Sequence, residues 1–155
     1  LLAGVLDGHS AARLHKRLVL EEGIAHSVSV SYDGLRRGPG VFYVAFTPVK
    51  DRELRDLEAV WLDEALKLVT HGVSEDELNR VKAQVIAGQV FSSDSVLGQA
   101  SRMGRMWAIG FAPNASDVIN EKLRVITPDQ VRQVAEKYLV EHQATIAILE
   151  PKTSK

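Results

Sequence analysis

The chain has no cysteine, few aromatic residues and nearly no net charge, at −1. The lack of cysteine excludes disulfides, thiolate catalysis and cysteine-ligated zinc. No apolar stretch reaches the roughly 18 residues that a membrane-spanning helix needs. The first six residues are too short and lack the basic leader of a signal peptide. Acidic and basic residues are interspersed, so the charge pattern favours neither nucleic acid nor a membrane surface as a partner.

What is present is the composition of a soluble globular protein. The 155 residues are 45% hydrophobic and 25% charged, enough for a core that needs no disulfide or structural metal. We expect a single domain over residues 1–155. Because the chain begins Leu1-Leu2 without an initiator Met and enters a helical pattern at once, we also expect it to be a fragment of a longer protein.

Hydrophobic periodicity predicts an α+β fold. Apolar and polar residues alternate along 24–32 and 41–47, which predicts two strands joined by a hairpin loop over 33–40. The stretch 144–149 predicts a third strand in the same sheet, since a lone strand leaves its backbone unsatisfied. The architecture expected is two layers, with an antiparallel or mixed sheet covered by helices on one face. Helical spacing predicts one or two helices before residue 20 and places the helices near 10–22, 52–70, 75–90, 94–108, 117–124 and 128–139.

Several local signals mark where these helices begin and end. Ser10 is a candidate N-cap, and Gly23 can take the left-handed conformation that ends a helix. Ser74 and Glu77 have capping-box spacing, with Glu77 able to reach back to the cap amide. Further caps are expected at 92–95 and at 127–130, where Pro and Gln follow Thr. Trp61 and Trp107 lie on apolar helical faces and are expected in the core.

The stretch 9–26 raises the question of a metal site, because it places His9, His15 and His26 around Glu21 and Glu22. A catalytic zinc ion needs three protein ligands. His9 and His15 are six residues apart, which corresponds to roughly 240° around a helix, so their side chains diverge. His26 lies on the predicted strand. Neither H-E-x-x-H nor H-x-x-E-H occurs, and we therefore predict no metal ligand and no catalytic residue in this chain.

The glycines of the 33–40 loop are explained by a turn. Gly34, Gly38 and Gly40 could suggest a phosphate-binding loop, but the segment joins two strands and no helix N-terminus follows it. Arg36 and Arg37 at its tip could contact an acidic partner. Two exposed arginines are more commonly only solvated.

A series of short motifs, in the same order along the chain, resembles the pitrilysin/insulinase family of zinc metallopeptidases, which includes the mitochondrial processing peptidases. Each motif is weak alone, and the ordered set covers nearly the whole chain. The motifs are Gly8, Ser10 and Arg13-Leu14; Glu21-Glu22-Gly23 followed by residues 24–28; Gly72-Val73-Ser74 with Glu77-Leu78 and Lys82; residues 125–131; and Glu150-Pro151.

The resemblance implies a particular part of such an enzyme. In the family, zinc is bound by H-x-x-E-H and a downstream Glu in the first subdomain of the active half. This chain looks like the second, non-catalytic subdomain, so it would hold no cofactor itself. Zinc would belong to a catalytic domain in the same chain or in a partner subunit. The resemblance also implies a bacterial protein, periplasmic or cytoplasmic, and leaves a dimer open.

The family also implies a chamber in which an extended peptide is cut, and the domain would form part of its wall. An Arg on the hairpin strand and a nearby Tyr grip the peptide in the family. Here residues 40–43 lack that Arg and residues 50–53 lack a Tyr. Loose substitutes are Arg36, Arg37, Phe42 and Tyr43, which we take as the candidate peptide-contact residues.

Three hypotheses follow. The first is a proteolytically silent domain of a zinc metalloendopeptidase. The second is a structural or interaction module of the same fold without any link to proteolysis, as in the family's respiratory-complex core subunits. The third is an unrelated hydrolase that uses His26 or His71, for which the sequence shows no nucleophile–base pair.

Overall fold

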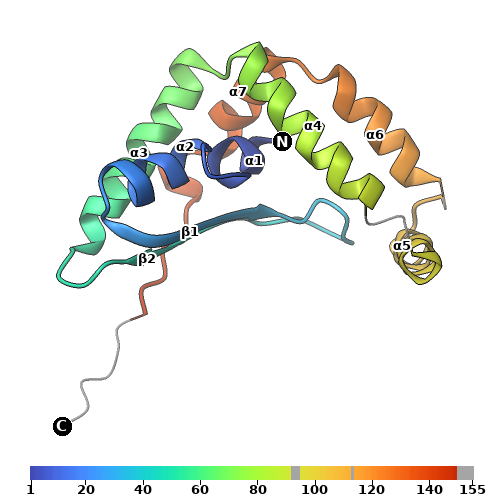
Figure 1. Ribbon diagram of the computed structural model, residues 1–155, viewed down its shortest axis with the longest axis horizontal. Helices are drawn as coiled ribbons and strands as arrows, with labels where there is room; N and C mark the ends of the chain where they lie inside the picture. The colour runs from blue at the N-terminus through green and yellow to red at the C-terminus, as the bar shows by residue number, and fades with distance from the viewer. Residues whose placement is uncertain (92–94, 113, 150–155) are drawn as a thin grey trace, which may run out of the picture.

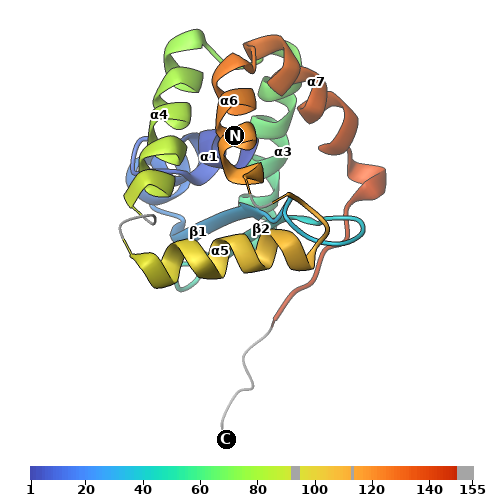
Figure 2. The same cartoon turned by 90° about the vertical axis from the view of Figure 1, so that its right-hand side faces the viewer.

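A computed structural model describes residues 1–91, 95–112 and 114–149. Two antiparallel strands, β1 (Ala25–Tyr32) and β2 (Phe42–Pro48), form a sheet with helices gathered on one of its faces (Figure 1). The α+β, two-layer prediction is confirmed. Helix α5 (Val96–Ala108) stands apart from this layer, at the hairpin end of the sheet (Figure 2). No helix among the residues described is long and apolar enough to cross a membrane.

The predicted elements agree with the structure to within about two residues in most cases. Predicted positions 92–94 lie outside the described residues, as does the polar segment after 149. The remaining elements are α1 (Leu2–Asp7), α2 (Arg13–His15), the π-helical turn η1 (Lys16–Glu21), α3 (Leu54–His71), α4 (Glu75–Phe91), α6 (Ala115–Val125), α7 (Pro128–Tyr138) and the 3-10 turn η2 (Glu141–Gln143).

The helix predicted over 10–22 begins three residues later than expected, at Arg13, and becomes π-helical from Lys16. Residues 10–12 form a turn in which His9 Nδ1 accepts the Ala11 amide at 3.1 Å, and the predicted Ser10 cap is wrong: the N-cap is Ala12. From Lys16 the turn is π-helical. Gly23 ends it with φ of +59°, as predicted, while the Ile24 amide donates to the Leu18 carbonyl at 2.9 Å.

The third strand predicted at 144–149 is wrong. Its residues are exposed and extended, and the sheet formed by the described residues has two strands. The alternation of Ile146 and Ile148 with smaller residues is typical of a strand, but a strand forms only beside another backbone that exchanges hydrogen bonds with it. After η2 the segment runs past the sheet toward the C-terminus and pairs with no strand among the residues that the structure describes (Figure 1).

The core is built around the turn between α1 and β1. Leu6, Leu14 and Leu18 are fully buried and pack with Leu57 and Leu68 of α3. Helix α4 contributes Leu78 and Val81. Gly4 lies at the edge of this packing, where a Cβ would lie 2.6 Å from Val81 Cγ1; outside the core, a Cβ on Gly40 would lie 2.8 Å from Cε2 of the exposed Tyr32.

The caps show where local signals hold and where distant contacts override them. Thr127 and Gln130 form the predicted capping box, with bonds of 3.3 and 2.9 Å, and Ser95 caps α5. Ser74 Oγ accepts the Glu77 amide at 3.2 Å. The sequence predicts that the Glu77 side chain reaches back to the cap amide. In the structure its carboxylate binds Arg13 instead.

The two tryptophans differ from each other. Trp61 is partly buried against the core, as predicted. Trp107 is 71% exposed, so its predicted core position is wrong. Its helix has an apolar stripe, but the stripe faces away from the body of the domain.

Replacing Leu18 with Ala should lower the free energy of unfolding by about 3 kcal/mol, because it leaves a cavity where the side chain is fully buried. Leu20→Ala, two residues away and 61% exposed, is the matched control and should change it by less than about 0.5 kcal/mol. Urea denaturation of both variants measures the difference. Equal effects would contradict the assignment of this turn to the core.

Candidate functional site

The histidines of the opening stretch are dispersed, as predicted. His9 Nδ1 is bound to the Ala11 amide, and His26 is exposed on β1. His15 Nδ1 lies 3.9 Å from Asp7 Oδ1, too far for a direct hydrogen bond. No group of three or more His, Asp or Glu side chains in the described part of the chain could hold a metal ion. The donor set of a zinc site does not fit these residues.

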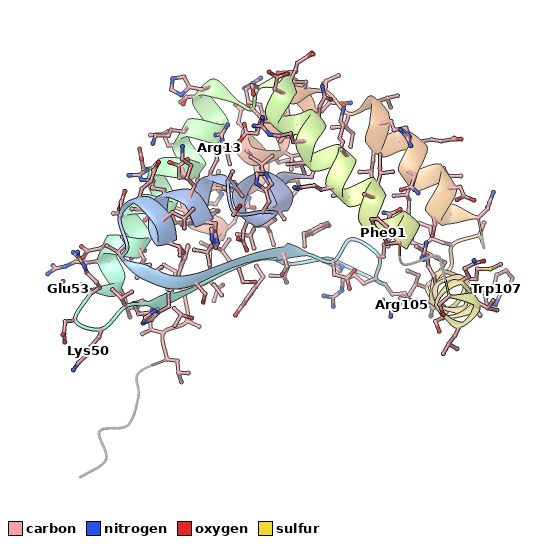
Figure 3. The ribbon with its side chains drawn as sticks, viewed as in Figure 1. Arg13, Lys50, Glu53, Phe91, Arg105 and Trp107 are labelled. Carbon is pink, nitrogen blue, oxygen red and sulfur yellow. The ribbon has the colours of Figure 1, made fainter. Side chains whose placement is uncertain are left out.

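Arg13 joins three elements through one side chain (Figure 3). From α2 its Nε and Nη2 donate to the two carboxylate oxygens of Glu77 in the first turn of α4, both at 2.7 Å. Its Nη2 also donates to the Gly72 carbonyl at 2.9 Å, at the end of α3. The hydrogen bond to Glu77 raises the pKa of Arg13 above its ordinary value. This bidentate geometry is the strong form of a charge-assisted pair.

Arg17 is the centre of a second ionic cluster. It donates to Glu22 at 2.7 Å, to Glu64 at 2.8 Å and to Asp63. Lys67 Nζ lies 2.9 Å from Asp63 and 3.0 Å from Glu64, which is buried. A depression of about 460 Å³ lies over this cluster, lined by Arg13, Lys16, Arg17, Glu21, Glu22, Glu64 and Lys67.

The charges in this depression are not set up for acid–base catalysis. Bonds to Glu22 and then Asp63 raise the pKa of Arg17, and bonds from Lys67 and then Arg17 lower the pKa of Asp63. A general acid or base works best with a pKa near the operating pH, and these shifts lead away from neutrality. The cluster therefore fastens η1 to α3.

The face of the sheet opposite the helices is the larger candidate surface. Val28, Val30, Val44 and Phe46 turn toward the helices. Because strand residues alternate, the other face carries three cross-strand pairs: Ser27 with Thr47, Ser29 with Ala45, and Ser31 with Tyr43. We call these six residues the open face. Its hydroxyl groups and one aromatic ring can offer hydrogen bonds and a flat contact to a ligand.

The structure separates the four residues predicted to contact peptide. Tyr43 is 57% exposed on the open face, and Arg36 and Arg37 are exposed on the loop that leads to β2. Phe42 points to the other side of the sheet and packs partly against the core. The alternation of Ser27, Ser29 and Ser31 is the signal in the sequence that indicates the open face.

Residues 1–85 match the family model described as the Peptidase M16 inactive domain. The chain belongs to this family. The resemblance to zinc metallopeptidases is thereby confirmed, and so is its assignment to their inactive domain.

A curated relative is an uncharacterized zinc protease of Streptomyces coelicolor, 25% identical over 139 residues. The match covers 90% of this chain and 30% of the relative, so this chain spans less than a third of that protein.

Solved structures share the fold. The inactive peptidase domain of a protein assigned as a zinc protease from Bordetella parapertussis has a TM-score of 0.81 and 17% identity, covering 98% of this chain and 82% of that one. A protease from Helicobacter pylori has a TM-score of 0.79 and 15% identity, covering 92% of this chain and 34% of that one.

Arg13→Ala should lower the free energy of unfolding by about 2 kcal/mol, because it removes charge-assisted bonds and leaves Glu77 with a largely covered carboxylate. A double-mutant cycle with Glu77→Ala should give a coupling of about 1 kcal/mol or more. Arg132→Ala, which breaks a surface pair with Glu136 on α7, is the control and should change stability by under about 1 kcal/mol. A coupling near zero between Arg13 and Glu77 would contradict the role given to the pair.

Proposed function

We propose that this chain is the non-catalytic domain of a zinc-dependent metalloendopeptidase, where it supports the zinc-binding domain and helps enclose an extended peptide. The match to an inactive peptidase domain carries the proposal. The chain forms one domain over residues 1–155 of a longer parent, in keeping with the length of the Streptomyces relative. Zinc would be bound by the parent's catalytic domain, because the described residues offer no set of ligands for it.

The open face is the surface that suits an extended peptide. Such a peptide can contact a sheet either along a strand edge or across a face. At the outer edge of β1, Asp7 Oδ2 already accepts the Val30 amide at 3.1 Å, which occupies one of the edge's donors. The open face has no helix over it (Figure 1) and presents Tyr43 beside Ser31. We place the peptide there, with Arg36 and Arg37 at the loop end to receive its acidic groups.

The second candidate is a structural module of the same fold that takes no part in proteolysis. The observation that favours it is the missing Arg at 40–43 and the missing Tyr at 50–53. The remainder of the parent sequence separates the two candidates. An H-x-x-E-H motif there, or in a partner subunit, supports the peptidase, and its absence from both supports the structural module.

The 155-residue chain should bind far less than one equivalent of zinc after equilibrium dialysis and should hydrolyse no peptide, because its histidines and carboxylates do not converge. Metal analysis of the dialysed protein and a fluorogenic peptide assay measure both. Stoichiometric zinc together with hydrolysis would overturn the proposal, and loss of that activity on His26→Ala or His71→Ala would favour the unrelated hydrolase.

In the parent protease, Tyr43→Ala should raise KM several-fold for a long peptide and leave kcat nearly unchanged, since the ring would contribute to peptide binding and not to the chemical step. Steady-state kinetics measure this. Tyr138→Ala, an exposed tyrosine on α7, is the matched control. If both variants have the same KM, the open face is not where the peptide lies.

A further inference from the structure

Helix α5 turns its most apolar side toward solvent. Val96, Ala100, Met103 and Trp107 recur at spacings of four, three and four, so they share one face of the helix. Val96 is 84% exposed, Met103 50% and Trp107 71%. We call these four residues the α5 seam. The buried residue of this helix is Met106, on a different side, and Trp107 points outward from the body of the domain (Figure 3).

Other apolar residues on and around this helix are exposed as well. Leu97 lies on α5 outside the seam, Phe91 ends α4, and Phe111 follows α5. Gly104 has open space where a side chain would be, with no atom within 4 Å of a Cβ placed on it. Exposed apolar side chains that share one helix face mark a surface that another element can cover.

The size of the seam favours a partner within the same polypeptide. The helix has 13 residues, and is therefore only about 20 Å long. Stable association between separate molecules buries about 1,200–2,000 Å² in total, more than one short helix supplies. Domains of a single chain associate through about 600–1,500 Å². A covalent link adds a high effective concentration, on the order of millimolar.

The length of related proteins agrees with such a partner. This chain covers 30% of the Streptomyces relative and 34% of the Helicobacter protease, so about two thirds or more of each of these proteins lies outside the matching part. A surface complementary to the seam is apolar, since its four residues carry no charge.

We propose that the α5 seam is the surface on which the zinc-binding domain of the parent protease docks, through an apolar surface of its own. The proposal rests on the proposed function and adds the place of contact. It accounts for Trp107, which sits on an apolar stripe without entering the core. Burial in this contact supplies the packing that the domain itself does not give.

Thiol labelling tests the docking. The chain has no cysteine, so Met103→Cys introduces one thiol, whose reaction with a maleimide is followed by peptide mass mapping. In the parent it should react roughly tenfold or more slowly than in the 155-residue chain, because labelling must wait for a local opening. Leu66→Cys, on α3 and 61% exposed, is the control and should react at similar rates in both proteins.

Two further measurements separate the outcomes. Adding Trp107→Glu to the parent should restore fast labelling at position 103, a comparison that does not need the isolated chain to fold. Equal rates at position 103 in every protein would overturn the proposal. Self-association would also overturn it. If labelling of the isolated chain slows as the protein concentration rises, and sedimentation shows a dimer, the seam is covered by a second copy of the chain.

Peptide hydrolysis by the parent distinguishes this proposal from the proposed function. If the parent is a zinc-dependent peptidase and position 103 stays reactive, the proposed function stands and only the docking proposal is overturned. If position 103 is protected in a parent that has no peptidase activity and no H-x-x-E-H motif, the seam is covered by some other domain. The proposed function and the identity of the docked domain are then both overturned.

Discussion

The packing of the α1–β1 turn under α3 and α4 is the constraint on which the rest of the domain depends. Leu6, Leu14 and Leu18 bring the start of the chain into contact with helices that follow much later. Arg13 fixes the orientation of these elements, because its side chain links α2 both to the end of α3 and to the start of α4. Hydrophobic burial supplies most of the stability, and the bidentate pair fixes how the three helices meet.

The ionic cluster at Arg17 illustrates the same division of roles. A buried carboxylate such as Glu64 is costly unless it is paired, and two cations satisfy it here. The depression above it looks like a site when judged by the types of side chain that line it. Its charges are already matched to one another, whereas the hydroxyl groups of the open face lie on the side of the sheet away from the helices.

Features determined by neighbouring residues could be predicted from the sequence. The hairpin, the left-handed Gly23 and the Thr127 capping box each depend on a few adjacent positions. The errors arose where a distant partner decides the outcome. Glu77 has the spacing of a cap but binds Arg13, 64 residues away. Residues 144–149 have a strand pattern but no neighbouring strand, and Trp107 has helical periodicity that cannot tell a core from an interface. For the site, the divergence of His9 and His15 could be inferred from their spacing, whereas Phe42 and Tyr43 were grouped although alternate strand residues face opposite sides.

The bond from the Val30 amide to Asp7 has a consequence for how this sheet can grow. Unprotected strand edges pair with the edges of other molecules, and natural proteins place charges there to prevent it. The Asp7 carboxylate of α1 lies at the edge of β1, so a strand from another molecule that approached this edge would meet a negative charge and a Val30 amide that is already bonded. The β1 edge is thereby less open to pairing with another strand than an edge without this charge would be.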